Sequence, residues 1–254
     1  MHHLAAFAGS IANGAVLAPL PALVDRLLTL QNTNNYTYGN NLKILRVYSR
    51  VDNGTEVRID TPNLRLIGPP QVWPIETTTL PGNLPPINKY DDSALPWNAL
   101  DPLGVLVSRG GAGALVQQTL FWLGETIQQP TPGPSRAVRA TAAITATNSS
   151  WTAGALTFQQ ALPTGRYRII GMAAFGTNLF AARLIIPGQV MNPGVLAQDA
   201  AGEFDHEWFR RGNFGDFGEF DSIAPPTLEV FAVGANAAQT VFLDLVPIGP
   251  VRGI

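Results

Sequence analysis

The sequence predicts an all-β protein made of many short strands joined by turns. Three observations carry this prediction. The 254 residues include 25 glycines and 21 prolines, several segments are rich in β-branched and aromatic residues, and the hairpin signals recur in the same order in both halves. Apolar residues make up 46% of the chain and charged residues 13%. This composition supplies a hydrophobic core and excludes a disordered chain.

The charged residues and the absence of cysteine exclude several classes of function. The chain has no cysteine, three histidines and a formal net charge of −2. A disulfide scaffold, a thiol nucleophile and a cysteine-ligated zinc site are therefore excluded, and the net charge does not favour a nucleic-acid partner.

The types of positively charged residue indicate that other subunits cover part of the protein surface. Lys43 and Lys89 are the only lysines, and every other cation is an arginine, the cation that is preferred at packed interfaces. We therefore expect other subunits to cover much of the surface; the alternative is a monomer of low charge.

Residues 1–35 are expected to form an apolar arm and a short helix. Residues 4–24 carry no charge, but Gly9, Asn13 and the prolines at 19 and 21 interrupt this run, so no membrane span is predicted. The early residues lack the basic stretch of a secretory signal. From Pro21 the apolar residues recur at helical spacing. The arm would reach a neighbouring subunit or a lipid layer, or the helix would cap the core.

The rest of the chain divides into two strand-rich blocks. In the first block, residues 36–127, the strand Leu42–Val51 is followed by Asn53-Gly54 and by the alternating segment Thr55–Ile59, which together predict a hairpin. Residues 128–136 (QQPTPGPSR) are typical of a linker. The second block, residues 137–254, repeats the order of the first.

The repeat can be followed residue by residue at an offset of 125. Leu42–Pro62 aligns without a gap to Tyr167–Pro187, so that Asn53 matches Asn178 and Arg58 matches Arg183. The offset continues to Leu103 and Leu228 and then shortens, which aligns Phe121 with Phe242. Each block has room for about eight short strands and carries a loop-rich insert, at residues 68–100 and 190–224. The prediction is two tandem eight-stranded jelly-roll β-sandwiches with short helices and an N-terminal arm.

This architecture resembles the double jelly-roll major capsid proteins of tailless icosahedral viruses, which often enclose a membrane. The offset of 125, the linker around Pro130–Pro134, the paired inserts and the apolar arm carry the resemblance over nearly the whole chain. It implies a structural capsid protein of the virion that self-assembles into pseudo-hexagonal homotrimeric capsomers forming an icosahedral shell. It also implies contacts with neighbouring capsomers, and a position of the arm near an internal lipid membrane or an adjacent capsomer.

The segment 203–220 (EFDHEWFRRGNFGDFGEF) is the best candidate for a subunit interface. Aromatic residues and arginine contribute most to interface energies. The candidate interface residues are Phe204, Trp208, Phe209, Arg210, Arg211, Phe214 and Phe217. The alternative is that these aromatics close the open end of the second sandwich. A platform for single-stranded nucleic acid also combines aromatics with arginine, but the acids of this segment would repel phosphate.

No constellation of residues predicts catalysis, a metal or a cofactor. Asp205, Asp216 and Asp221 could hold Ca²⁺, although solvated acids that balance Arg210 and Arg211 are favoured. Asp91-Asp92 is typical of a turn, and neither a serine nucleophile elbow nor a phosphate-binding loop is present. The protein is therefore not predicted to be an enzyme.

Two other binding or structural roles remain open. A carbohydrate-binding β-sandwich module or lectin would present Trp73, Trp97 or Trp151 as an exposed platform. A single jelly-roll coat protein with a projecting domain would carry a basic inner arm, whereas this arm is uncharged to residue 24.

Overall fold

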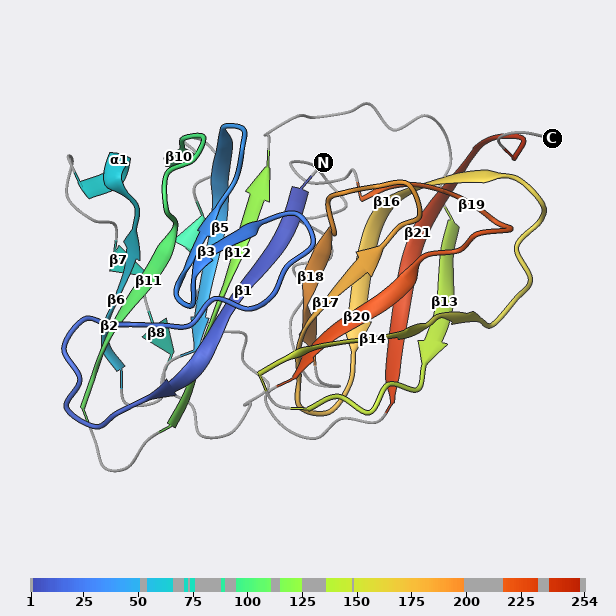
Figure 1. The fold of residues 1–254 in the computed structure, drawn as a ribbon. Coiled ribbons are helices and arrows are strands. Elements are labelled where there is room, and N and C mark those ends of the chain that lie inside the picture. Colours follow the sequence, from blue (N-terminus) through green and yellow to red (C-terminus); the bar gives the residue numbers. More distant parts are fainter. Residues whose placement is uncertain are drawn as a thin grey trace. The chain divides into compact units, whose positions relative to one another are not determined.

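The protein folds into two compact units that share the same kind of architecture (Figure 1). The computed structural model describes residues 2–50, 54–65, 71–72, 74–75, 88–89, 95–110, 115–124, 136–147, 149–198, 217–232 and 238–251. The N-terminal unit comprises Leu4–Thr126. The C-terminal unit comprises Ile127–Ile254 together with Met1–His3.

The N-terminal unit contains two principal sheets. The first has the order β1 (His2–Ile11), β12 (Leu115–Gly124), β5 (Leu42–Arg50) and β10 (Leu95–Trp97), with β8 (Pro74–Ile75) and β9 (Asn88–Lys89) also paired to β5. The second has the order β2 (Ala18–Pro19), β11 (Gly104–Arg109), β6 (Gly54–Asp60) and β7 (Gln71–Val72). A small hairpin of β3 (Thr29–Asn32) and β4 (Asn35–Thr37) and the helix α1 (Pro62–Arg65) complete it.

The C-terminal unit has the same two layers, joined through one strand. One layer has the order β14 (Trp151–Ala155), β20 (Thr227–Ala232), β17 (Leu179–Ile185) and β18 (Gly194–Gln198). The other has the order β13 (Arg136–Ala142), β21 (Gln239–Gly249), β16 (Arg166–Phe175) and β19 (Gly218–Asp221), with β15 (Thr157–Phe158) on the outer side of β13. Strand β18 also pairs in parallel with the end of β16, which links the layers.

The strand order confirms the predicted fold class. When the eight principal strands of each unit are counted along the chain, both units place the first, third, sixth and eighth strands in one sheet and the second, fourth, fifth and seventh in the other. This is the double Greek-key arrangement of a jelly roll. The protein is therefore an all-β protein of two tandem jelly-roll sandwiches.

The pairing registers show that the two units match strand by strand. The strands β5 and β6 match β16 and β17 at the predicted offset, but the predicted hairpin is wrong, because β5 and β6 pair with β12 and β11 in different sheets instead of with each other. The same holds for β16 and β17, so each connection crosses between the two layers. Asn178, the partner of Asn53 in the repeat, has the positive φ of 58° that its turn requires. Val57 pairs with Val72 as Ala182 pairs with Val195. Strand β8 pairs in parallel with the end of β5, as β18 pairs with the end of β16.

Two of the sequence alignments were wrong in register. Ile59 pairs with Val105, and its counterpart Leu184 pairs with Leu228, so Val105 rather than Leu103 corresponds to Leu228. Val47 pairs with Phe121, and its counterpart Met172 pairs with Leu243, so Phe121 corresponds to Leu243 and not to Phe242. A shift by two residues keeps the same face of a strand, whereas a shift by one reverses it. Accordingly Phe121 and Leu243 are both fully buried, while Phe242 is half-buried.

The first residues of the chain form a strand instead of an arm. Leu4–Phe7 of β1 are fully buried beside β12, and Tyr36 Oη donates a 2.7 Å hydrogen bond to the backbone oxygen of Ala6. The Phe7 ring packs edge-on against the rings of Tyr36 and Phe121. The buried side chains of β1 are therefore not available to a lipid layer or a neighbouring subunit.

The helix expected from Pro21 is absent as well, and that prediction was wrong. Residues 21–28 are extended and bent, Ala22 forms a bridge to Phe7, and the backbone N–H of Leu23 donates to the oxygen of Ala6. Pairing with β1 satisfies backbone groups that a helix would have satisfied internally. Within the described residues, no helix is long and apolar enough to cross a membrane.

Candidate functional site

Most of the predicted interface residues lie outside the part of the chain that the structure describes. Phe204, Trp208, Phe209, Arg210, Arg211 and Phe214 belong to this group. Phe217 is described and is fully buried: its ring packs edge-on against His2 at 5.0 Å, and its backbone N–H donates to the oxygen of Ile169. Phe217 thus belongs to the interior of the C-terminal unit and not to a surface that could meet another subunit.

The other sequence candidates are placed only in part. Of the three proposed calcium ligands only Asp221 is described, and the described residues contain no cluster of three metal-ligating side chains. Asp91 and Asp92 also lie outside the described residues. Trp97 is buried and donates from Nε1 to the oxygen of Asp101, and Trp151 is half-buried under Arg183; Trp73 is not described. Neither Trp97 nor Trp151 is an open platform for a sugar.

The N-terminal histidines contact the segment 192–194 of the C-terminal unit. His2 and His3 are fully buried. The backbone N–H of Asn192 donates to Nδ1 of His3 at 2.9 Å, and Nε2 of His2 lies 3.2 Å from the backbone oxygen of Gly194. Because Nδ1 of His3 accepts a hydrogen bond, this nitrogen carries no proton in the structure. The sequence analysis did not single out this pair, because nothing in the sequence indicated that the two histidines would be buried.

A buried ion pair lies in one sheet of the C-terminal unit. Nε of Arg183 on β17 donates to Oε2 of Glu229 on β20 at 2.7 Å, and the two residues are register partners. Only 2% of the Arg183 side chain and 10% of the Glu229 side chain are exposed. The guanidinium lies 4.1 Å from the centre of the Trp151 ring, a cation–π contact. Arg58, the counterpart of Arg183 in the repeat, is half-buried and pairs with Glu56 on its own strand.

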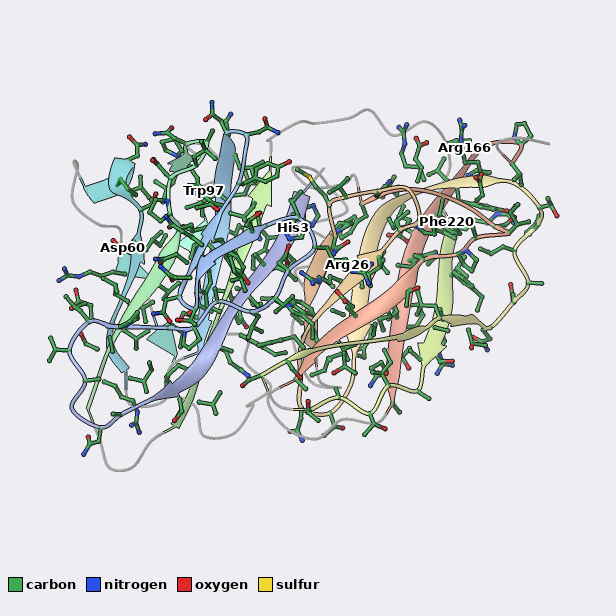
Figure 2. All side chains as sticks on the ribbon, viewed as in Figure 1. His3, Arg26, Asp60, Trp97, Arg166 and Phe220 are labelled. Atoms are coloured by element: carbon green, nitrogen blue, oxygen red, sulfur yellow. The ribbon has the colours of Figure 1, made fainter. Side chains whose placement is uncertain are left out.

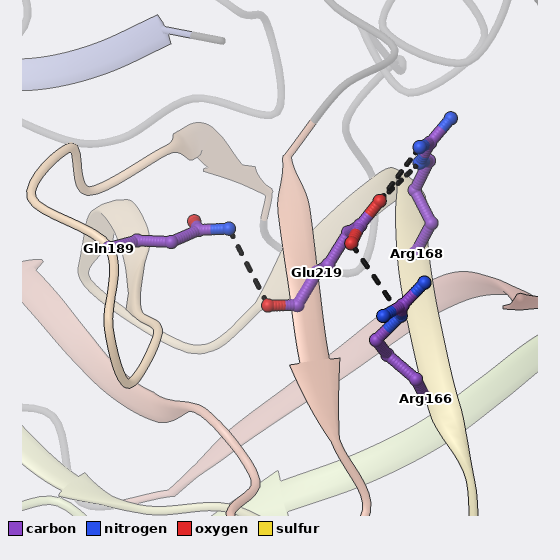
Figure 3. Close-up of polar contacts among 4 residues, drawn as sticks. All are labelled: Arg166, Arg168, Gln189 and Glu219. Carbon is purple, nitrogen blue, oxygen red and sulfur yellow. Dashed lines mark hydrogen bonds and ion pairs between the residues drawn. The ribbon is translucent and has the colours of Figure 1, made fainter. Parts of the chain in front are cut away.

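A second group of charges lies on β16 and β19 at the surface (Figure 3). Arg168 donates from Nε and Nη2 to Oε1 of Glu219, at 3.1 and 2.7 Å. Nε of Arg166 lies 3.8 Å from Oε2 of the same carboxylate. The side-chain amide of Gln189 contacts the backbone oxygen of Glu219. One carboxylate therefore serves two guanidinium groups, and Arg168 holds it by the shorter contacts.

A groove lies in the C-terminal unit beside Arg166, the first residue of β16, which is labelled in Figure 2. The volume of the groove is about 460 Å³. Residues 136–138 of β13 line one side, residues 160–167 line another, and Leu245, Pro247 and Gly249 of β21 line the third. The groove combines apolar side chains with two arginines, Arg136 and Arg166, and none of its features was predicted from the sequence.

Comparisons with known proteins found no family for the chain and a weak similarity to a solved structure. No family model matches the chain, and no curated protein matches it. The crystal structure of the major capsid protein P2 from bacteriophage PM2 aligns over 100% of both chains, with 12% sequence identity and a TM-score of 0.26. A score of this size does not establish a shared fold, so function has to be argued from the chain itself.

Proposed function

We propose that this protein is a structural capsid protein of a virus, which self-assembles through trimeric capsomers into a closed shell. The supporting observation is the presence of two jelly rolls of equal strand order in one chain. Three copies around a threefold axis would present six similar sandwiches. A capsomer of that kind has nearly sixfold contacts and can tile a surface, which a single jelly roll achieves only with six chains.

The composition of the surface supports assembly. The chain has two lysines and 13% charged residues, so it lacks the charged coat of a typical soluble monomer. Several large apolar side chains are nevertheless exposed among the described residues: Val16, Val24, Leu100, Val190 and Ile223 are each more than 60% exposed. Contacts between copies would cover such residues.

The aromatic segment 203–220 remains part of this proposal, except for Phe217, which is buried. Trp208 and Phe209, with Arg210 and Arg211, would anchor a neighbouring subunit. Contacts of the first residues with an internal membrane are less favoured, because the apolar side chains of β1 are buried in the N-terminal unit. A membrane contact would have to use exposed residues such as Val16 and Val24.

The experiment is to replace Trp208 and Phe209 together by alanine and to image the purified protein by electron microscopy. If both residues anchor an interface, the wild type forms capsomers with a six-lobed outline and the variant gives single chains with an unchanged circular dichroism spectrum. Loss of the β-sheet spectrum would place the two residues in the core. Intact capsomers in the variant would remove them from the interface.

A carbohydrate-binding module is the second candidate from the sequence, and the described residues give it little support. Trp97 is buried and Trp151 is covered by a guanidinium, so the aromatic platform that such a module needs is not found at either position.

A further inference from the structure

The groove of the C-terminal unit has walls that are held in place before any ligand arrives. Tyr167 Oη donates to the backbone oxygen of Pro163 at 2.8 Å. The backbone N–H of Gly165 donates to Oγ of Ser222 at 3.0 Å, and the N–H of Ser222 donates back to the oxygen of Gly165 at 2.9 Å. The segment 163–165 is therefore fixed to β16 and to the turn after β19, and a ligand would not have to order it.

Strand β13 presents to this groove backbone groups that no described strand pairs with. It pairs with β21 along its whole length, from Arg136 to Ala142; on its other edge, among the residues that the structure describes, it pairs with β15 only at Ala140 and Thr141. The N–H of Gln159 donates to the oxygen of Arg139 on that edge. Backbone groups alternate in direction from one residue to the next along an antiparallel strand. Ala137 lies two residues before Arg139, so its N–H and C=O point to the same edge of β13 as those of Arg139. They lie beyond the end of β15, where Ala137 lines the groove.

The groove also carries positive charge. Arg136 is exposed and forms no ion pair with any residue that the structure describes. Arg166 contacts Glu219 at 3.8 Å, while Arg168 holds that carboxylate by two hydrogen bonds. Asp221 is the register partner of Arg166 and is the other acid at this end of β19. The guanidinium of Arg136 is thus a positive charge at the groove, with no ion pair to Glu219 or Asp221 among the described residues.

We propose that this groove binds an extended peptide segment of a partner protein that carries glutamate or aspartate. The peptide would add to the free edge of β13, with its backbone bonded to the N–H and C=O of Ala137. Its carboxylate would bind Arg136 and Arg166, and its apolar side chains would lie against Val138 and Leu245. Edge pairing supplies affinity in this mode of recognition, and the side-chain contacts supply specificity. This inference does not depend on the proposed capsid function.

The first test measures binding of the peptide acetyl-Val-Glu-Val-Glu-Val-amide to the full chain by isothermal titration calorimetry, beside the same peptide with glutamine for glutamate. We expect the glutamate peptide to bind at least about tenfold more tightly. Arg136→Ala and Arg166→Ala should each weaken its binding by about tenfold. Arg139→Ala is the matched control: it removes an exposed arginine of the same strand that does not line the groove, and should change binding less than about twofold.

The second test addresses the strand edge. Ala137→Pro removes the N–H that points to the groove without removing a bond to β21, and proline is tolerated at such edge positions. We expect it to weaken the glutamate peptide by about tenfold with an unchanged melting temperature. Should proline disturb the fold, methylating the backbone nitrogens of the peptide tests the same contact on the unaltered protein.

The proposal would be overturned by equal affinity for the two peptides, by equal effects of Arg136→Ala and Arg139→Ala, or by no binding of the glutamate peptide at millimolar concentration. Arg136-dependent binding of heparin without binding of the peptide would also overturn it, because the groove would then serve an anionic glycan.

Discussion

Two equivalent arginines of the repeat differ in burial and in the position of their carboxylate partners. Arg58 and Arg183 occupy equivalent positions of the repeat, yet Arg58 is half-buried beside Glu56 and Arg183 is buried against Glu229. The sequence alignment found the identity of the two arginines, but not the difference in burial. Burial depends on the cross-strand neighbour, and that neighbour was identified only by the register of β17 with β20.

The ion pair gives a prediction for stability. Glu229→Ala leaves the Arg183 guanidinium buried without its carboxylate, so the free energy of unfolding should fall by about 3–5 kcal/mol. Glu219→Ala is the control, because its pair with Arg168 is partly exposed and should contribute no more than about 1 kcal/mol. Urea unfolding followed by tryptophan fluorescence measures both. Equal losses in the two variants would show that the Arg183 pair is solvated.

The hydrogen bond to His3 gives a second prediction at this scale. His3→Ala leaves the buried N–H of Asn192 without its acceptor, so stability should fall by about 1–3 kcal/mol. His3→Asn offers a side-chain oxygen as a replacement acceptor and should recover part of the loss. Thermal unfolding measures the difference. An alanine variant as stable as the wild type would show that the first residues are not held in the C-terminal unit.

At the scale of elements, the central strands of each unit were predictable, but their pairing and the N-terminal strand were not. Segments rich in β-branched residues, with Asn53-Gly54 in one turn and Asn178 in the other, locate β5, β6, β16 and β17, because these signals are local. Strand β1 reads HHLAAFAGSI and has a single β-branched residue, so its sequence has little intrinsic strand preference. Pairing with β12 and burial of Phe7 produce the strand, and these long-range contacts leave no periodic signal in the sequence.

The groove could not be predicted from the sequence either, because segments that are distant in the sequence form it. Its three sides come from β13, residues 160–167 and β21, which are far apart in the sequence. Arg136 and Arg166 carry no motif, and only the pairing of the strands brings them to one groove.

The close packing of β17 and β18 gives a prediction for one element. A Cβ on Gly194 would lie 2.7 Å from the Cβ of Arg183 and closer still to the backbone oxygen of Ala182. Gly194→Ala should therefore move the strands apart and lower stability by about 1–3 kcal/mol. Gly39→Ala is the control, since no atom lies within 4 Å of the added carbon and its φ is not positive. A melting temperature that is unchanged in Gly194→Ala would contradict this packing.

At the scale of the whole molecule, the repeat is the property that links sequence to proposed function. Each unit closes its own jelly roll around its own core, for example around Phe7 and Phe121 in one and Phe180 and Phe231 in the other. Similar sandwiches offer similar edges and faces, which is what quasi-equivalent contacts in a shell require. The fold class was predictable because the strand and turn signals repeat in both halves. The contacts between copies were not predictable, because they depend on surfaces that no local sequence pattern determines.

The native mass in solution tests the central claim most directly. Size-exclusion chromatography with light scattering gives this mass without reference to shape. Assembly predicts a mass of three chains of 27.1 kDa, or of a much larger particle, that persists on dilution to micromolar concentration. A single species of 27.1 kDa at high protein concentration would contradict the capsid proposal.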